Sequence, residues 1–214
     1  MVELREAKLQ DLDKIAHCHR SAFPNTLSSR LGVSISYKML QWYLIDDKRF
    51  LFWLAKDNVC VGYAGGMISD GTQIHGSASG TIQFAFREIV VALLLKPWLW
   101  FHPELVSRYP LILKNIYFRI TGFKTPAKDR KGAILAEPHT SLVVIGVHPE
   151  HQGRGYGSLL LKAFEQKTID MGFNKMLLTV LADNVQAIKS YVKNGWTKVR
   201  QENKSVNMQK IVYK

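Results

Sequence analysis

The sequence is poor in cysteine and in long apolar runs, and each shortage excludes some classes of protein. Its two cysteines, Cys18 and Cys60, form no Cys-x-x-Cys pair, which argues against a disulfide framework and favours a reducing, cytoplasmic location. The opening residues 1–5 lack a basic region followed by an apolar stretch, so we expect no secretory signal. The longest apolar block, residues 89–101, is interrupted by a Lys-Pro pair and is shorter than the ~20 residues that span a membrane. We therefore predict no transmembrane segment, and interpret this block as a buried helix in preference to a membrane-surface or partner contact.

Acidic residues are also scarce, with 17 Asp/Glu against 29 Lys/Arg and a formal net charge of +12. Half of the excess lies in residues 87–131, which hold nine Lys/Arg and three Asp/Glu. A local basic surface of this kind suits a phosphate-bearing partner, whether a small molecule, a lipid head group or a nucleic acid. No helix-turn-helix, zinc or single-strand-binding signature is present, so a non-enzymatic nucleic-acid binder is the least favoured function. The apolar part of the segment offers a surface for a homodimer.

Strand and helix signals alternate along most of the chain. Alternation predicts strands over residues 2–6, 50–55, 59–63, 141–147, 175–181, 197–202 and 206–213. Helical periodicity predicts helices over 9–23, 37–45, 155–171 and 184–194. The polar residues 25–34 should form a loop, and the Gly/Ser-rich residues 71–80 a flexible connection. We predict an α/β (α+β) fold with a mixed sheet flanked by helices, forming a single domain over 1–214 with a helical, basic and apolar insertion at about 69–131.

A glycine-rich turn joins the strand expected at 141–147 to the helix expected at 155–171. It reads Gln152-Gly153-Arg154-Gly155-Tyr156-Gly157-Ser158. The three glycines allow a tight backbone turn and leave its N–H groups uncovered, while the helix that follows adds unpaired donors and a positive dipole end. These groups predict a phosphate or pyrophosphate site, to which Arg154 adds a cation. The spacing matches neither a P-loop nor a dinucleotide fingerprint.

This turn resembles the Q/R-x-x-G-x-G/A signature of the GNAT acetyltransferase superfamily. A second stretch, Asn184-x-x-Ala187-x-x-x-Tyr191-x-x-x-Gly195-Trp196, resembles the N-x-x-A-x-x-x-Y-x-x-x-G-F pattern that closes the coenzyme site in these proteins. The resemblance covers residues 140–214 well and 1–67 loosely, and it leaves the insertion unexplained.

The resemblance implies a splayed sheet that binds acetyl-CoA as co-substrate, with no metal. The pantetheine arm would pair with exposed backbone of the strand before the turn, and one backbone N–H there could polarise the thioester carbonyl. The pyrophosphate would lie on the amides of the turn. The implied coenzyme-binding residues are Ile145, Gly146, Val147, Gln152, Gly153, Arg154, Gly155, Tyr156, Gly157, Ser158 and Asn184.

Catalysis then needs an acid for the leaving thiolate and a base for the attacking amine. Tyr191 occupies the position of the family's acid. Histone-modifying members of the family carry a glutamate at the position that is Ser141 here, and serine is no base. Members that acetylate ribosomal proteins carry their base at the position that is His139 here. Glu137 lies on the same side of an extended chain as His139. Either His139 or Glu137 could act as the base, directly or through water.

The implied function is acetyl-CoA-dependent N-acetyl transfer to a primary amine. The loop 23–30 and the insertion should build the acceptor side. The insertion resembles, more loosely, that of acetyltransferases in bacterial surface-polysaccharide pathways, which would imply an amino sugar on a nucleotide or lipid diphosphate. The alternative is a protein or peptide N-acetyltransferase, for which we expect an acidic groove near residues 23–47, where only Asp46 and Asp47 are acidic.

Overall fold

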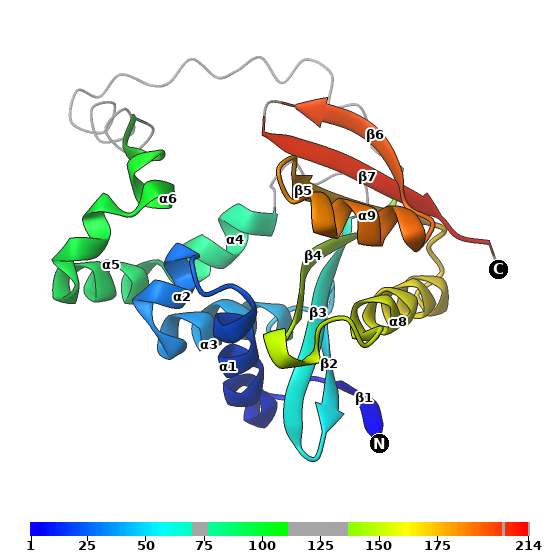
Figure 1. The fold of residues 1–214 in the computed structure, drawn as a ribbon, viewed down its shortest axis with the longest axis horizontal. Helices are drawn as coiled ribbons and strands as arrows, with labels where there is room; N and C mark the ends of the chain where they lie inside the picture. The colour runs from blue at the N-terminus through cyan, green and yellow to red at the C-terminus, as the bar shows by residue number, and fades with distance from the viewer. Residues whose placement is uncertain (70–76, 111–136, 203, 214) are drawn as a thin grey trace.

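A seven-stranded sheet runs through the protein in the computed structural model, which describes residues 1–69, 77–110, 137–202 and 204–213 (Figure 1). The strand order is β1-β2-β3-β4-β5-β7-β6. The strands are β1 (Val2–Glu6), β2 (Arg49–Lys56), β3 (Val59–Ser69), β4 (His139–Val147), β5 (Lys175–Leu181), β6 (Thr197–Glu202) and β7 (Ser205–Ile211). The mixed sheet flanked by helices confirms the predicted fold class.

The sheet consists of two antiparallel parts that meet at one parallel junction. Strands β1 to β4 pair antiparallel, as do β5, β7 and β6. At the junction, β4 pairs with β5 only where Thr140–Leu142 face Met176–Leu178. Beyond Leu142, strand β4 keeps its pairing to β3 as far as Val147 but has no further partner residue on β5. The sheet is therefore splayed from this junction onward.

Each face of the sheet carries its own helices and its own buried cluster. Helices α1 (Leu12–Ala22) and α3 (Val33–Gln41) pack with β2 and β3 around Ile15, Trp53 and Tyr63. Helices α8 (Tyr156–Asp170) and α9 (Val185–Lys193) share the other cluster, which includes Phe164 and Trp196. The remaining helical segments are η1 (Leu9–Asp11), α2 (Leu27–Leu31), η2 (Trp42–Leu44), α4 (Ser77–Phe84), α5 (Phe86–Leu95), η3 (Pro97–Phe101), α6 (Pro103–Val106) and η4 (Pro149–His151).

Three local predictions need correction. The expected loop 25–34 contains α2, a short helix whose Leu31 packs in a third buried cluster with Ile35 and Leu99. The expected flexible connection 71–80 includes the start of α4 at Ser77, and its remaining residues 71–76 lie outside the described residues. The apolar block 89–101 is helical as predicted, but α5 contains no buried residue and most of η3 is exposed. The buried-helix interpretation is therefore wrong.

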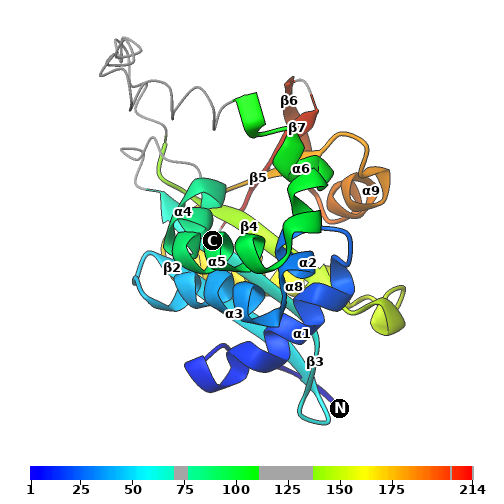
Figure 2. The same cartoon turned by 90° about the vertical axis from the view of Figure 1, so that its left-hand side faces the viewer.

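The described part of the predicted insertion, residues 77–110, lies at one end of the molecule, beside α2 and α3 and away from β6 and β7 (Figures 1 and 2). Its described helices α4, α5 and α6, with η3, contact the N-terminal helices rather than the sheet's far half. The rest of the predicted insertion, residues 111–131, lies outside the described residues.

Candidate active site

The glycine turn adopts a backbone that side chains would resist. Gly153 and Gly155 have φ angles of +74° and +82°, in the left-handed region where non-glycine residues are strained. Gly155 is the N-cap of α8 and supplies no capping side chain. Among the described residues, the first helix amide with a backbone acceptor is that of Leu159, which donates to the Gly155 carbonyl. The amides before it are left to face an anion.

The edge of β4 leads directly into this turn. Ile145, Gly146 and Val147 pair with β3 on one side and have no pairing to β5 on the other. Gly146 is buried, and a Cβ there would lie 2.9 Å from Tyr63 Cε1 and 3.0 Å from Phe23 Cε2, so only glycine fits. Since alternate backbone groups of a strand point to opposite sides, part of this stretch offers unpaired N–H and C=O groups to the gap.

Beside Arg154, the turn has further basic residues that the sequence analysis did not single out: His148, His151 and Lys56. Burial and then the neighbouring charges of Arg154, Lys56 and His148 lower the pKa of His151 below its ordinary value. The His148 and His151 rings lie 5.8 Å apart, and their Nδ1 atoms are buried without a hydrogen-bond partner. Lys56 comes from the end of β2, about a hundred positions earlier in the chain. Spacing within the motif could not have revealed it.

In the second motif, Tyr191 lies on α9 and an asparagine lies at each end of that helix. The side chain of Asn184 accepts a hydrogen bond from the Ala187 amide at 3.1 Å and so caps α9. At the other end of α9, Asn194 Nδ2 donates to Ser158 Oγ at 3.1 Å, which ties α9 to the glycine turn. Tyr191 is partly buried 6.1 Å from the Trp196 ring, and burial raises its pKa to about 12. The Tyr191 hydroxyl therefore stays protonated at neutral pH.

The two candidate bases lie at the start of β4, far from the turn. His139 and Val147 are its first and last residues, so a rise of ~3.3 Å per residue separates them by roughly 26 Å. His139 is buried, and its Nδ1 lies 2.8 Å from the Glu137 carbonyl oxygen. That acceptor requires the proton on Nδ1 and leaves the Nε2 lone pair to take another.

Glu137 is less suited to take a proton than His139. Its side chain is exposed and forms an ion pair with Lys175 at 2.8 Å. The hydrogen bond and the charge of Lys175 lower the pKa of Glu137, which makes its carboxylate a weaker base.

A buried polar chain joins the first helix to β3, and sequence reasoning did not find it. His19 Nδ1 contacts the Tyr63 hydroxyl, and His19 Nε2 lies 3.5 Å from Ser28 Oγ. Ser28 in turn contacts Thr26 Oγ1 at 3.2 Å. Burial lowers the pKa of His19 to about 4, so the ring is neutral at pH 7. Its Nδ1 can then accept a hydrogen bond from the Tyr63 hydroxyl. These hydrogen-bonded side chains hold the loop after α1 against β3, the strand that carries Tyr63, beside Gly146.

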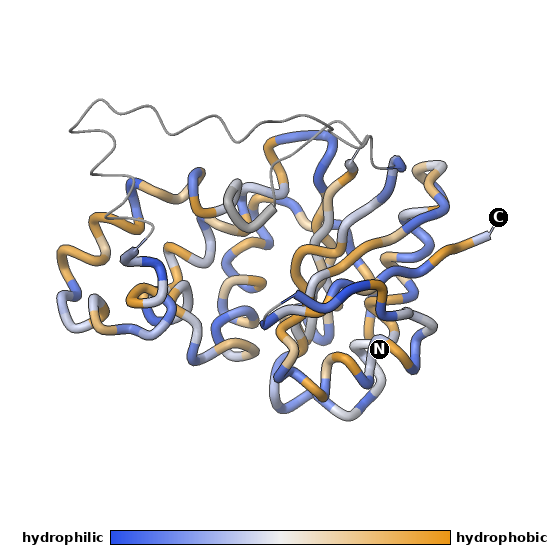
Figure 3. The backbone as a smooth tube through the Cα atoms, turned by 90° about the horizontal axis from the view of Figure 1, so that it is seen from above, coloured by the Kyte–Doolittle hydropathy of each residue, from blue (hydrophilic) through white to orange (hydrophobic). Residues whose placement is uncertain are grey.

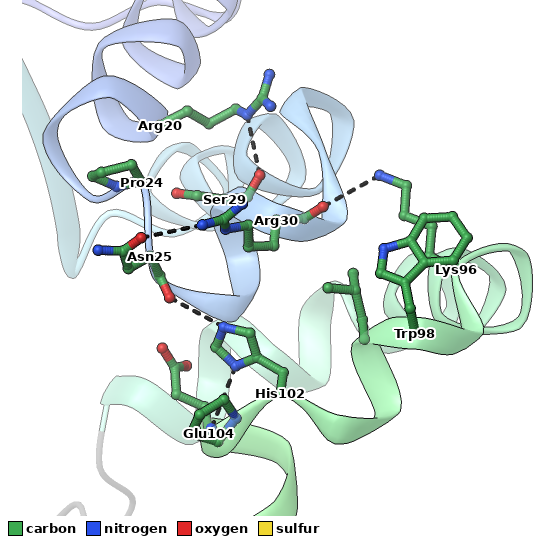
Figure 4. Close-up of a pocket in the computed structure, with 11 residues that line it drawn as sticks. Arg20, Pro24, Asn25, Ser29, Arg30, Lys96, Trp98, His102 and Glu104 are labelled. Atoms are coloured by element: carbon green, nitrogen blue, oxygen red, sulfur yellow. Dashed lines mark hydrogen bonds between the residues drawn. The ribbon is translucent and has the colours of Figure 1, made fainter.

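A cavity of about 850 Å³ opens between that loop and the insertion (Figure 4). Arg20 and Arg30 line it from one side, and Lys96, Trp98 and His102 from the other. His102 Nε2 donates to the Asn25 carbonyl at 3.1 Å, and the Lys96 ammonium donates to the Leu31 carbonyl at 2.6 Å. One carboxylate, that of Glu104, faces these cations and accepts from the Leu27 amide. The cavity is therefore predominantly basic.

Residues 113–196 match the acetyltransferase (GNAT) family. Over this stretch the chain is similar to GNAT acetyltransferases. Two solved structures share its fold: an N-acetyltransferase from Thermoplasma acidophilum in complex with coenzyme A (TM-score 0.57, 11% identity, 99% of both chains covered), and the ribosomal-protein-S18-alanine N-acetyltransferase from Escherichia coli (TM-score 0.56, 13% identity, 99% and 94% covered).

Curated relatives are more similar in sequence, but over a shorter stretch. A mycothiol acetyltransferase of Corynebacterium aurimucosum is 39% identical over 54 residues, which cover 25% of this chain and 18% of the relative. Another, from Paenarthrobacter aurescens, is 34% identical over 103 residues, which cover 46% and 29%. This chain thus spans less than a third of the length of the curated relatives it matches.

No helix among the described residues is long and apolar enough to cross a membrane. No group of three or more His, Cys, Asp or Glu side chains in the described ranges could hold a metal ion.

Proposed function

We propose that this GNAT protein transfers an acetyl group from acetyl-CoA to a primary amine. The observation that carries the proposal is the gap between β4 and β5, whose unpaired edge runs into a left-handed glycine turn at the start of α8. An amide-bearing chain that ends in a pyrophosphate is complementary to such a groove along its whole length.

The residues present fit this coenzyme. Cβ atoms added at Gly153, Gly155 and Gly157 would meet no protein atom within 4 Å, so the space above the turn is open to a ligand. The amides from Gln152 to Ser158 would hold the pyrophosphate, and Arg154 and Lys56 would supply charge. Ile145 to Val147 would pair with the amide-bearing arm, as one strand pairs with another.

The thioester supplies the acetyl group and a thiolate leaving group, and side chains of the protein supply the groups that donate and accept protons. The turn fixes the phosphate end, so the reacting end lies toward the closed junction at Thr140–Leu142, where His139 begins the strand. The Nε2 lone pair of His139 can take a proton from the acceptor's ammonium group, directly or through water, and so free the amine to attack the thioester. Glu137, held by Lys175, is the weaker candidate.

Tyr191 serves the sulfur as a hydrogen-bond donor. Its pKa of about 12 exceeds the ~8.5 of an ordinary thiol by ~3.5 units, so complete transfer of its proton would cost about 5 kcal/mol. A hydrogen bond to the developing negative charge needs no complete transfer and stabilises the transition state.

The basic cavity supports an acceptor that carries phosphate or another anion. Arg20 and Arg30 bring guanidinium groups to it, and Trp98 offers a flat apolar surface. This agrees with an amino sugar on a nucleotide or lipid diphosphate. A cationic peptide, the alternative acceptor, would meet the same positive charges. The acidic groove expected for a peptide acceptor rests on Asp46 and Asp47, and the carboxylate of Asp46 is already paired with Arg49 at 3.2 Å.

A screen of acceptors tests both parts of the proposal. Thiol release from acetyl-CoA would be followed with amino sugars, nucleotide-linked amino sugars and amine peptides. We expect turnover with a phosphate-bearing amino sugar, and a KM that rises at least about tenfold in Arg20→Gln/Arg30→Gln but not in the control Arg5→Gln. Turnover of peptides alone would refute the acceptor class, and absence of coenzyme binding would refute the function itself.

A further inference from the structure

Helix α5 is apolar on both of its faces, which a helix at the surface of a soluble domain is not. Ile89, Ala92 and Leu93 pack on the cluster of Leu31, Ile35 and Leu99. Five further apolar side chains of α5 lie outside this contact, and at 100° per residue four of them fall on the opposite half of the helix. The five are Phe86, Val90, Val91, Leu94 and Leu95, with exposed fractions of 61%, 38%, 49%, 66% and 73%.

The exposed apolar surface continues into the next turn of chain. In η3, Trp98 is 64% exposed, Trp100 47% and Phe101 83%. The Trp100 indole N–H donates to the Leu93 carbonyl at 2.9 Å, which fixes this turn against α5. We call these eight residues of α5 and η3 the apolar face. Figure 2 views the molecule from the end that carries α5, and Figure 3 colours much of this end as hydrophobic.

Positive charge accompanies the apolar face. Arg87 lies within the exposed half of α5, and Arg108 is exposed just after α6. The acids of residues 77–110 are turned toward the protein, since Glu88 pairs with Lys38 at 3.8 Å and Glu104 accepts from the Leu27 amide. The surroundings of the apolar face are therefore basic, as is the whole chain at +12.

This charge decides which partner fits. A second copy of the chain would bring one basic surface against another, and juxtaposed like charges oppose association. An anionic bilayer attracts basic residues, and Trp, Phe and Leu side chains partition into its head-group region. Helix α5 has ten residues and is ~15 Å long, about half the ~30 Å of a hydrocarbon core, so it can lie on a bilayer but cannot cross it.

We propose that the apolar face docks this protein on the surface of an anionic lipid bilayer. The aliphatic and aromatic side chains of α5 and η3 enter the head-group boundary, and Arg87 and Arg108 contact lipid phosphates. This inference concerns a different surface from the coenzyme groove, and of the apolar face Trp98 also lines the basic cavity. It does not depend on the proposed function.

Co-sedimentation of the full chain with vesicles tests it. The protein should bind phosphatidylcholine vesicles that contain phosphatidylglycerol, and bind those of phosphatidylcholine alone about tenfold less. High salt should weaken the binding. Leu94→Gln/Leu95→Gln should reduce partitioning about 10–100-fold, because two exposed side chains that enter the bilayer become polar.

A control removes two apolar side chains elsewhere that are also more than half exposed. Leu4 and Val59 are 51% and 60% exposed on β1 and β3, and Leu4→Gln/Val59→Gln should bind vesicles like the wild type. Circular dichroism of all variants checks that they are folded. The proposal is overturned if the wild type ignores anionic vesicles, or if both double variants bind alike. It is also overturned if Leu94→Gln/Leu95→Gln only converts a dimer to a monomer in light scattering.

Discussion

Replacement of Gly155 by valine separates coenzyme binding from folding. The residue has φ +82°, and an added Cβ would meet no protein atom within 4 Å. The cost to the fold is therefore backbone strain of about 1–3 kcal/mol, which is smaller than the 5–15 kcal/mol that stabilises a typical domain. We expect a folded variant whose melting temperature falls by roughly 2–12 °C.

The effect on the coenzyme should be much larger. Valine would relax the turn away from its left-handed backbone and fill the space that the pyrophosphate needs. If two charge-assisted hydrogen bonds of about 1.5–3 kcal/mol each are lost, the Kd for acetyl-CoA rises roughly 10²–10⁴-fold. Isothermal titration calorimetry would measure the Kd directly.

Gly172 provides the matched control. It has φ +83° and equally open space, but lies just after the other end of α8. Gly172→Val should lower the melting temperature by a similar amount and leave the Kd unchanged. Equal loss of affinity in both variants, or wild-type affinity in Gly155→Val, would refute the assignment of the phosphate site.

Three further predictions concern protons. Tyr191→Phe should lower kcat about 10–100-fold with an unchanged coenzyme Kd, because the hydrogen bond to the developing thiolate is lost while the ring still packs on Trp196. If turnover stays at the wild-type rate when chemistry is rate-limiting, Tyr191 is a packing residue. His139→Gln should lower kcat about 10²–10⁴-fold, whereas Glu137→Gln should leave kcat nearly unchanged; the reverse result would exchange their roles. Phosphate bound at the turn should raise the lowered pKa of His151. Coenzyme affinity should therefore fall as the pH rises through the pKa of His151 in the complex. Calorimetry in two buffers should show proton uptake on binding, and His151→Gln should reduce this uptake.

Local signals were enough to predict the motif region. Strand β5 and strand β6 have the predicted bounds, and the turn at Gly153 and Gly155 has the left-handed backbone that its glycines suggested. Helix α2 was missed although Leu27 and Leu31, four residues apart, are a helical signal, because the polar residues between them resemble a loop.

Contacts between distant segments could not be predicted from one sequence. The charge of Lys56, at the end of β2, acts on His151, and His19 contacts Tyr63 across 44 positions. The burial of α5 was predicted wrongly for a related reason. Periodicity can indicate that a segment is helical, but it does not reveal whether another part of the chain covers its second face.

The splayed junction has a consequence for amide hydrogen exchange. Between Val143 and Val147, β4 pairs with β3 but not with β5, so the amides on its other side have no strand partner in the middle of a sheet. Slow and fast exchange should therefore alternate along one strand. A ligand that pairs with this edge would slow the fast amides without changing the slow ones, so its binding can be followed residue by residue even when the fold does not move.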